Sequence, residues 1–341
     1  MMDFLDGFWI QLILKLVGIL LVVLTGALVV IYAELKIGSH MQTRIGPYYA
    51  GGRWGWAQPL ADGLKFLQKE DLAPDGADRT VYGFAPYVVM MSTIAVFVVV
   101  PFGPDLVGAN LDLGAFFLLA ISSLSVLGVL MAGWSSANKY SLMGGLRAAG
   151  QLIAYELPLV LAVVAVVIQA GTMSLNGIVD AQSQTVFTIA GFDVSLPYIL
   201  QGQIIGFVIF MVAAVAELSR IPFDMPIAES ELTMGYLTEY SGIRFTMFFL
   251  GEYASMIALS AIAATLYLGG YAAPGLPGDL ANFAGPLILL LKISILVFFI
   301  IWIRWTWPRL REDQLQTLAW TWLIPLALVN IAIISIFKVV F

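Results

Sequence analysis

Eight long apolar runs leave this chain few ways to fold. A backbone amide in hydrocarbon must find its partner within its own segment, so apolar runs of about 20 residues are expected to be membrane-spanning helices. The composition agrees, because 60% of the residues are hydrophobic and 11% are charged, whereas soluble domains carry about 25% charge. We predict an all-α polytopic membrane helix bundle, a single membrane domain over 1–341, with eight transmembrane helices near 9–33, 84–102, 113–134, 151–170, 198–218, 245–268, 284–304 and 318–338.

The positive charges predict which connections face the cytoplasm or matrix. Lysine and arginine concentrate in alternate connections, and short translocated loops avoid such charge. We therefore expect four inner loops on one face of the bundle, at 34–83, 135–150, 217–244 and 304–317. An even number of spans then places both termini on the outer side. The outer connections are short or rich in glycine and proline, so we expect plain turns there.

Composition also narrows the chemistry. The net charge of -6 argues against nucleic acid as a partner, and the chain has no cysteine and one histidine, His40. Disulfides, iron–sulfur ligation and bis-histidine haem need residues that this chain does not supply. We expect no metal site, no bound cofactor and no catalytic nucleophile, because serines such as Ser135 and Ser141 have no histidine at usable spacing. Any redox centre would therefore belong to another chain.

The first inner loop contains a helical pattern with two faces. Apolar and polar side chains separate at helical spacing after Trp56, which is typical of a helix lying in the plane of the membrane interface. The apolar face holds Trp56, Leu60, Leu64 and Leu67, and the opposite face holds Gln58, Asp62, Lys65 and Lys69. We predict an interfacial amphipathic helix here. A lid that covers the bundle ends without a further role is the alternative.

The third inner loop, 217–244, is unusually acidic. Pro222 and Pro226 break helicity at the membrane edge, so freed backbone groups there need protein or water partners. Its charged residues are Glu217, Asp224, Glu229, Glu231 and Glu239 against Arg220 and Arg244. A merely solvated acidic loop is one interpretation. Because the loop continues directly from an apolar run, a polar site at the membrane boundary is the other.

Two more acids fall inside predicted spans. Glu156 and Glu252 each lie a few residues from the inner boundary. Carboxylates in hydrocarbon are costly, so they usually face a bundle interior or a wet cavity, and they are proton-relay candidates. Lys292, near the middle of the seventh span, is one available partner. A buried ion pair that only fixes helix packing is the alternative.

Four polar motifs in the same order resemble a known family. They are Gln42, Arg44, Gly46 and Pro47 leading to QPLADGLKFLQKED; WSSANKYSLMGGLRAAGQLIAYELP; AELSRIPFDMPIAESEL followed by GYLTEYSGIRF; and IRWTWPRLREDQL. Together they cover nearly the whole chain and resemble the quinone-site membrane component, called the H subunit, of respiratory complex I, a proton-translocating NADH:quinone oxidoreductase. Family members usually read Glu-Arg-Lys where this chain has Leu35 in the middle, and Pro-Glu-Ala-Glu where it has Ile227.

The resemblance implies a subunit that joins the peripheral electron-transfer arm to the proton-pumping arm, in a bacterial plasma membrane or an organellar inner membrane. Its substrate is a lipid quinone. Iron–sulfur clusters and flavin belong to partners, which are the peripheral-arm quinone-site and iron–sulfur subunits and the small and antiporter-like membrane subunits. By motif, the quinone-chamber residues are Glu34, Arg44, Asp62, Arg220, Asp224, Glu229, Glu231 and Phe245. The acids that couple reduction to proton translocation are Glu156, Glu217 and Glu252.

Two other functions compete with this one. The equivalent subunit of a membrane-bound hydrogenase or a ferredoxin-linked complex would share the same motifs but a different electron donor. A secondary ion transporter could use the same buried carboxylates. No two-half repeat with paired broken helices is evident, however, and many transporters leave that trace.

Overall fold

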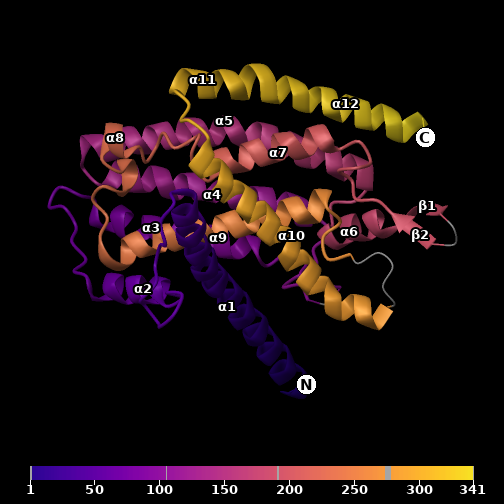
Figure 1. Cartoon of the computed structure of the whole chain (residues 1–341), viewed down its shortest axis with the longest axis horizontal. Coiled ribbons are helices and arrows are strands. Elements are labelled where there is room, and N and C mark those ends of the chain that lie inside the picture. The colour runs from indigo at the N-terminus through magenta and orange to yellow at the C-terminus, as the bar shows by residue number, and fades with distance from the viewer. Residues whose placement is uncertain (1, 105, 190–191, 273–277, 341) are drawn as a thin grey trace.

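The computed structural model describes residues 2–104, 106–189, 192–272 and 278–340. Helices dominate this part of the chain, and one short antiparallel hairpin joins them. The elements in chain order are α1 Met2–Met41, α2 Gln58–Gln68, α3 Arg79–Val96, α4 Gly114–Ser135, α5 Lys139–Ala170, α6 Leu175–Ser183, β1 Thr185–Ile189, β2 Phe192–Ser195, α7 Ile204–Glu217, α8 Glu229–Leu232, α9 Gly242–Tyr267, α10 Gly278–Thr306, α11 Glu312–Thr317 and α12 Ile324–Val340 (Figure 1). A π-helical turn, Leu318–Leu323, joins α11 to α12 without a break.

Six helical segments in the described ranges are long and apolar enough to cross a membrane. They are Trp9–Met41, Gly114–Ser135, Lys139–Ala170, Gly242–Tyr267, Phe283–Thr306 and Glu312–Val340. The expected bundle of membrane helices is therefore confirmed in type. The full number of eight stays a prediction, because α3 is not among the six and α7 has 14 residues. At about 1.5 Å per residue, α7 spans about 21 Å, less than the hydrocarbon core of about 30 Å.

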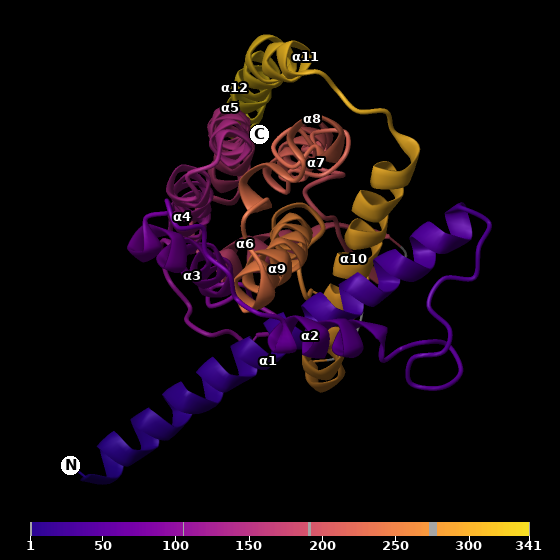
Figure 2. The ribbon, with the colours of Figure 1, turned by 90° about the vertical axis from the view of Figure 1, so that its left-hand side faces the viewer.

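Helix α9 forms the centre of the bundle. Of its most apolar window 72% is buried, against 22% for the corresponding window of α1. It contacts α1, α3, α7 and α10 directly, and the end-on view shows these helices around it (Figure 2). Buried side chains such as Met256 and Ile262 lie in the large apolar core that these helices share. Helix α9 therefore fixes the frame on which the inner loops are held.

Two helices continue into regions that the sequence assigned to inner loops. Helix α1 runs to Met41, so Glu34 lies on a helix and not at the start of a loop. Helix α5 starts at Lys139, because Asn138 accepts a hydrogen bond from the Tyr140 amide and caps the helix there. The predicted loop 135–150 is thus mostly helical. Apolar runs mark the membrane-embedded part of a helix, whereas the capping residue marks its true beginning.

One outer connection is more structured than expected. The segment after α5 holds α6 and the hairpin β1–β2, where plain turns were predicted. Ser174 caps α6 by accepting a hydrogen bond from the Gly177 amide. Figure 1 shows the hairpin and the C-terminus at one end of the bundle, and α2 and α8 at the opposite end. The connections predicted to be inner and those predicted to be outer therefore gather at opposite ends.

Candidate functional site

Two cavities adjoin where the ends of α1, α2, α7 and α9 meet. The larger, of about 870 Å³, is lined by the 219–234 loop, α9 and the end of α10, and we call it the Arg220 cavity. The second, of about 500 Å³, lies between α1, α2 and α9, and we call it the α2 cavity. Phe249, Tyr253 and Arg304 line both. The two cavities are therefore adjacent and share part of their lining.

Arg220 lies at the wall of the first cavity and is almost fully buried, with 3% of its surface exposed. Its Nη1 donates to Glu34 Oε2 at 2.5 Å, and its Nε donates to Glu252 Oε1 at 2.9 Å. The guanidinium also lies 4.5 Å from the centre of the Tyr253 ring. Burial alone would lower the pKa of Arg220, but Glu252 and Glu34 raise it above its ordinary value, so the charge is retained.

Glu34 is the second buried member of this cluster. It pairs with Arg304 from α10 as well as with Arg220. One carboxylate therefore serves two guanidiniums, which join α1, the loop after α7 and α10. The remaining Arg220 nitrogen, Nη2, is buried and has no hydrogen-bond partner within the described residues. Arg220 as a whole lines the cavity, but this nitrogen is shielded from it.

The loop that carries Arg220 is held by contacts from distant elements. Buried Gln151 on α5 donates from Nε2 to the carbonyl oxygens of Ala216 and Phe223, each at 2.8 Å. Arg309 Nη2 donates to the Asp224 carbonyl oxygen at 2.6 Å and lies 3.5 Å from its carboxylate. Gln151, Arg304 and Arg309 were not predicted as site residues, because contacts with distant elements leave no local pattern in the sequence.

Burial and nearby cations act on the pKa of Asp224 in opposite directions. Burial raises the pKa of Asp224 to about 6, although Arg309 and Arg304 act to lower it. Its side chain is 28% exposed and lines the Arg220 cavity together with Glu229 and Phe245. This carboxyl group can therefore exchange a proton in the ordinary range of cellular pH.

The α2 cavity is more apolar. Leu28, Ile31 and Leu35 of α1 and Phe66 of α2 line it, with Arg44 and Asp62 also in its wall. Arg44 donates to Gln42 Oε1, and Asp62 accepts from Gln58 Nε2. The amphipathic helix predicted from Trp56 onward is present as α2, with Trp56 and Lys69 just outside it. Its apolar side chains Leu60, Leu64 and Leu67 are exposed. An exposed apolar face of this kind suits the membrane interface predicted for it.

The predicted chamber residues therefore meet, with one exception. Seven of them line the two cavities: Glu34, Arg44, Asp62, Arg220, Asp224, Glu229 and Phe245. The exception is Glu231, which lines neither cavity. Its carboxylate pairs with Arg147 at 2.8 Å on the surface, with 53% of the side chain exposed. Glu229 and Glu231 are two positions apart on α8, and at about 100° per residue their side chains face nearly opposite ways.

The three predicted coupling acids are divided between two places. Glu252 lines the Arg220 cavity, and its partner is Arg220. Lys292, considered as a partner from sequence, instead donates to the carbonyl oxygens of Leu268 and Gly270 beyond the other end of α9. Glu217 lines a separate pocket of about 30 Å³ among hydroxyl side chains. Glu156 is close enough to Glu217 to act on its charge.

The comparisons with known proteins identify the family. The NADH dehydrogenase family model matches residues 14–335. The chain belongs to the NADH dehydrogenase family. A relative from Syntrophobacter fumaroxidans, named as H subunit 2 of NADH-quinone oxidoreductase, is 46% identical over 98% of this chain and 97% of its own. Relatives from Anoxybacillus flavithermus and Dehalococcoides mccartyi, each named as the H subunit of that enzyme, are 44% and 41% identical over 95% and 96% of this chain and 93% and 87% of theirs.

Membership of the NADH dehydrogenase family confirms the resemblance seen in the four motifs. Together with the six apolar helices, it makes the chain a membrane protein and a subunit of an enzyme complex. The chain contains no cysteine. In the described ranges, no group of three or more His, Cys, Asp or Glu side chains is arranged to hold a metal ion. The side chains that line the two cavities include charged and aromatic ones, such as Arg220, Glu252 and Phe249.

Proposed function

We propose that this chain is the membrane subunit of a complex I-type NADH:quinone oxidoreductase, and that the two adjoining cavities hold its quinone. The observation that carries the proposal is their shared wall at Phe249, Tyr253 and Arg304. These three side chains lie between an apolar space beside α1 and α2 and a polar space beside Arg220. A lipid quinone needs both, because its isoprenoid tail is apolar and its headgroup accepts hydrogen bonds and protons. Volumes of about 500 and 870 Å³ lie in the range of ligand sites.

Each chamber residue then has a physical role. Arg220 places a positive charge in the cavity wall beside a quinone carbonyl oxygen, and Glu34 and Glu252 hold its guanidinium rigidly. Phe245 supplies a ring face beside it. Arg44 and Asp62 form the polar rim of the α2 cavity, and Asp224 and Glu229 supply protonatable oxygen atoms to the Arg220 cavity. The headgroup therefore finds donors and protons at the Arg220 end.

Coupling to proton translocation is assigned to Glu252, Glu217 and Glu156. Glu252 belongs to the Arg220 cluster, so a change of charge in the cavity acts on it first. The pocket at Glu217 is also lined by Ser92, Thr93, Ser122, Ser125 and Ser255. It is large enough for a water molecule with several polar partners. If Glu156→Gln and Glu217→Gln subunits assemble normally and retain full quinone reduction and full pumping, this part of the proposal is wrong.

The orientation and partners follow from the same proposal. The inner loops 34–83, 135–150, 217–244 and 304–317 face the peripheral-arm quinone-site and iron–sulfur subunits, which carry the clusters and flavin. The small and antiporter-like membrane subunits lie beside the bundle. Both termini are on the outer, periplasmic side of a bacterial plasma membrane, or the corresponding side of an organellar inner membrane. The names of the relatives support NADH as the electron source more than a hydrogenase or ferredoxin-linked complex, and a subunit more than an ion transporter.

A photoreactive quinone tests the chamber directly. The native complex is irradiated with an analogue that carries the reactive group on its headgroup, and labelled peptides are mapped by mass spectrometry. We expect labelling in the 219–229 loop and near Phe249, competed by unlabelled quinone. Phe249→Trp narrows the space between the two cavities and should reduce labelling of the 219–229 loop. Phe116→Trp, on the exposed face of α4, should not reduce it. Labelling confined to residues outside both cavities would contradict the proposal.

A further inference from the structure

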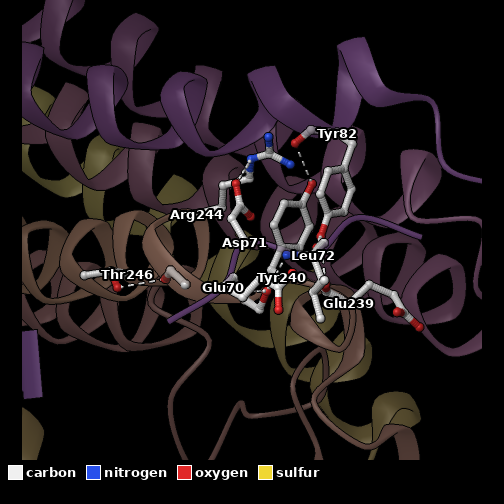
Figure 3. A network of polar contacts seen from close by, with 10 residues as sticks. Glu70, Asp71, Leu72, Tyr82, Glu239, Tyr240, Arg244 and Thr246 are labelled. Atoms are coloured by element: carbon white, nitrogen blue, oxygen red, sulfur yellow. Dashed lines mark hydrogen bonds and ion pairs between the residues drawn. The ribbon is translucent and has the colours of Figure 1, made fainter. Parts of the chain in front are cut away.

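A cluster of contacts outside the chamber joins the chain after α2 to the beginning of α9 (Figure 3). Ser241 is the residue immediately before α9, where a serine side chain usually caps the helix. Here it makes no capping hydrogen bond. Its hydroxyl instead donates to the Glu70 carbonyl oxygen and accepts from the Leu72 amide, both at 3.1 Å. The serine therefore holds the 70–72 segment and not its own helix.

Gly242 and Arg244 hold the same segment from two further directions. Gly242 has a φ of +57°, and a Cβ there would lie 3.0 Å from the Lys69 carbonyl oxygen. No side chain fits between the two backbones without displacement. Arg244 Nε pairs with Asp71 Oδ2 at 3.1 Å. A cation in the first turn of a helix interacts unfavourably with the positive end of the helix dipole, and the Asp71 carboxylate offsets that cost.

The cluster is anchored to α3 by aromatic side chains. The Tyr82 and Tyr240 rings stack with centroids 4.2 Å apart, and the Arg244 guanidinium lies 5.3 Å from the centre of the Tyr82 ring. The Tyr82 hydroxyl donates to the Glu239 carbonyl oxygen at 2.7 Å, and the Tyr240 hydroxyl donates to the Tyr82 carbonyl oxygen at 3.1 Å. The loop before α9 is therefore fixed on α3 and can in turn fix α2.

What this cluster positions is a pair of rings between the two cavities. Phe66, two residues before the end of α2, lines the α2 cavity, and Phe245, the residue after Arg244, lines the Arg220 cavity. Their centroids are 5.6 Å apart. Both rings are separated from the clamped residues by only a few positions in the chain. A shift of the 69–72 segment relative to α9 therefore changes the distance between them.

We propose that Ser241 and Arg244 are positioning residues that hold Phe66 against Phe245 and so set the width of the passage between the two cavities. The inference rests on the proposed function, because it assigns to a quinone the need for that passage. Neither residue lines either cavity, so each acts through α2. A narrower or wider passage changes the fit of a tail that must lie along it, and affects a short-tailed quinone least.

The test uses the assembled complex with Ser241→Ala, Arg244→Gln and Arg244→Lys. We expect the first two to raise KM for a long-tailed quinone about 3- to 10-fold, the range that one hydrogen bond corresponds to. KM for a short-tailed quinone and kcat for both should stay nearly unchanged. Arg244→Lys keeps the positive charge beside Asp71, so its KM for the long-tailed quinone should stay close to that of the unaltered complex. Matched controls are Ser123→Ala, whose hydroxyl donates within its own helix, and Arg79→Gln, at an exposed position.

Hydrogen exchange gives a measurement independent of activity. Residues 58–72 should exchange faster in the Ser241→Ala and Arg244→Gln complexes than in the controls. If that exchange is faster but the ratio of the two KM values is unchanged, the passage is not set here and the inference is overturned. Equal losses with both quinones would also overturn it. Failure of the proposed function looks different, because the photoreactive quinone would then not label either cavity in the unaltered complex.

Discussion

Replacing Arg220 by leucine removes a buried cation that faces two carboxylates at once. The side chains of Arg220 and Glu34 are 2% and 7% exposed, and that of Glu252 is 27% exposed. Removing one partner of a buried pair costs about 3 to 5 kcal/mol, because the other charge is left without compensation. The two losses do not add fully, since Glu34 keeps Arg304 and Glu252 reaches some solvent. We therefore expect about 3 to 5 kcal/mol in total for Arg220→Leu.

That loss is a large share of the roughly 5 to 15 kcal/mol by which folded proteins are typically stable. Glu252→Gln is the matched control, because its amide oxygen still accepts from Arg220 Nε and Arg220 keeps Glu34. It should cost about 1 kcal/mol, as for one altered hydrogen bond. The assay is the amount of assembled complex in membranes, followed by its thermal unfolding. Arg220→Leu complexes that assemble and melt like the unaltered complex would refute the reasoning, as would equal effects of both variants.

Three further substitutions separate support of the loop, its protonation and the opposite end of the bundle. Gln151→Leu leaves the carbonyl oxygens of Ala216 and Phe223 unpaired, which should cost about 1 to 3 kcal/mol in thermal unfolding. The pKa of Asp224, raised by burial to about 6, means that stability from this group is present at low pH and lost as pH rises from about 4 to about 6. Asp224→Asn should flatten that part of a melting-temperature profile against pH. Lys292→Met should lower the melting temperature by removing two hydrogen bonds, with KM for quinone unchanged, as a titration of quinone reduction would check.

Local sequence patterns predicted the features that depend on residues close together in the chain. The apolar runs located the long spans, and the alternation after Trp56 located α2, since both features depend on neighbours within one or two turns. The helix ends were wrong at Met41 and Lys139, because polar residues continue a helix after the membrane ends. The outer hairpin was missed although β1, Thr185–Ile189, is a run of five β-branched and aromatic residues that is typical of a strand.

The sequence predicted many of the residues that belong to the site, but not how their side chains pair. The motifs named Glu34, Arg220 and Glu252, which the structure brings into one cluster. Arg304 lies within the fourth motif but was not assigned to the site, because its partner Glu34 lies 270 positions away in the chain. A pairing over that separation depends on how α1 and α10 pack, and periodicity carries no information on it. The same limit explains why Lys292 was considered for Glu252, although it lies at the other end of α9.

The two departures from the family pattern have a common place in the structure. Leu35, where relatives usually have arginine, lines the α2 cavity, and Ile227, where they usually have glutamate, lines the Arg220 cavity. One positive and one negative charge are therefore absent from adjoining walls. A lone charge in a poorly solvated wall is expensive, whereas the removal of an opposite pair leaves the sum unchanged. The remaining pairs, which join Arg220 and Arg304 to Glu34 and Glu252, balance one another. Because the cluster is neutral when all four are ionised, a single proton taken up there leaves one unbalanced positive charge, felt most strongly by the acids nearest to it.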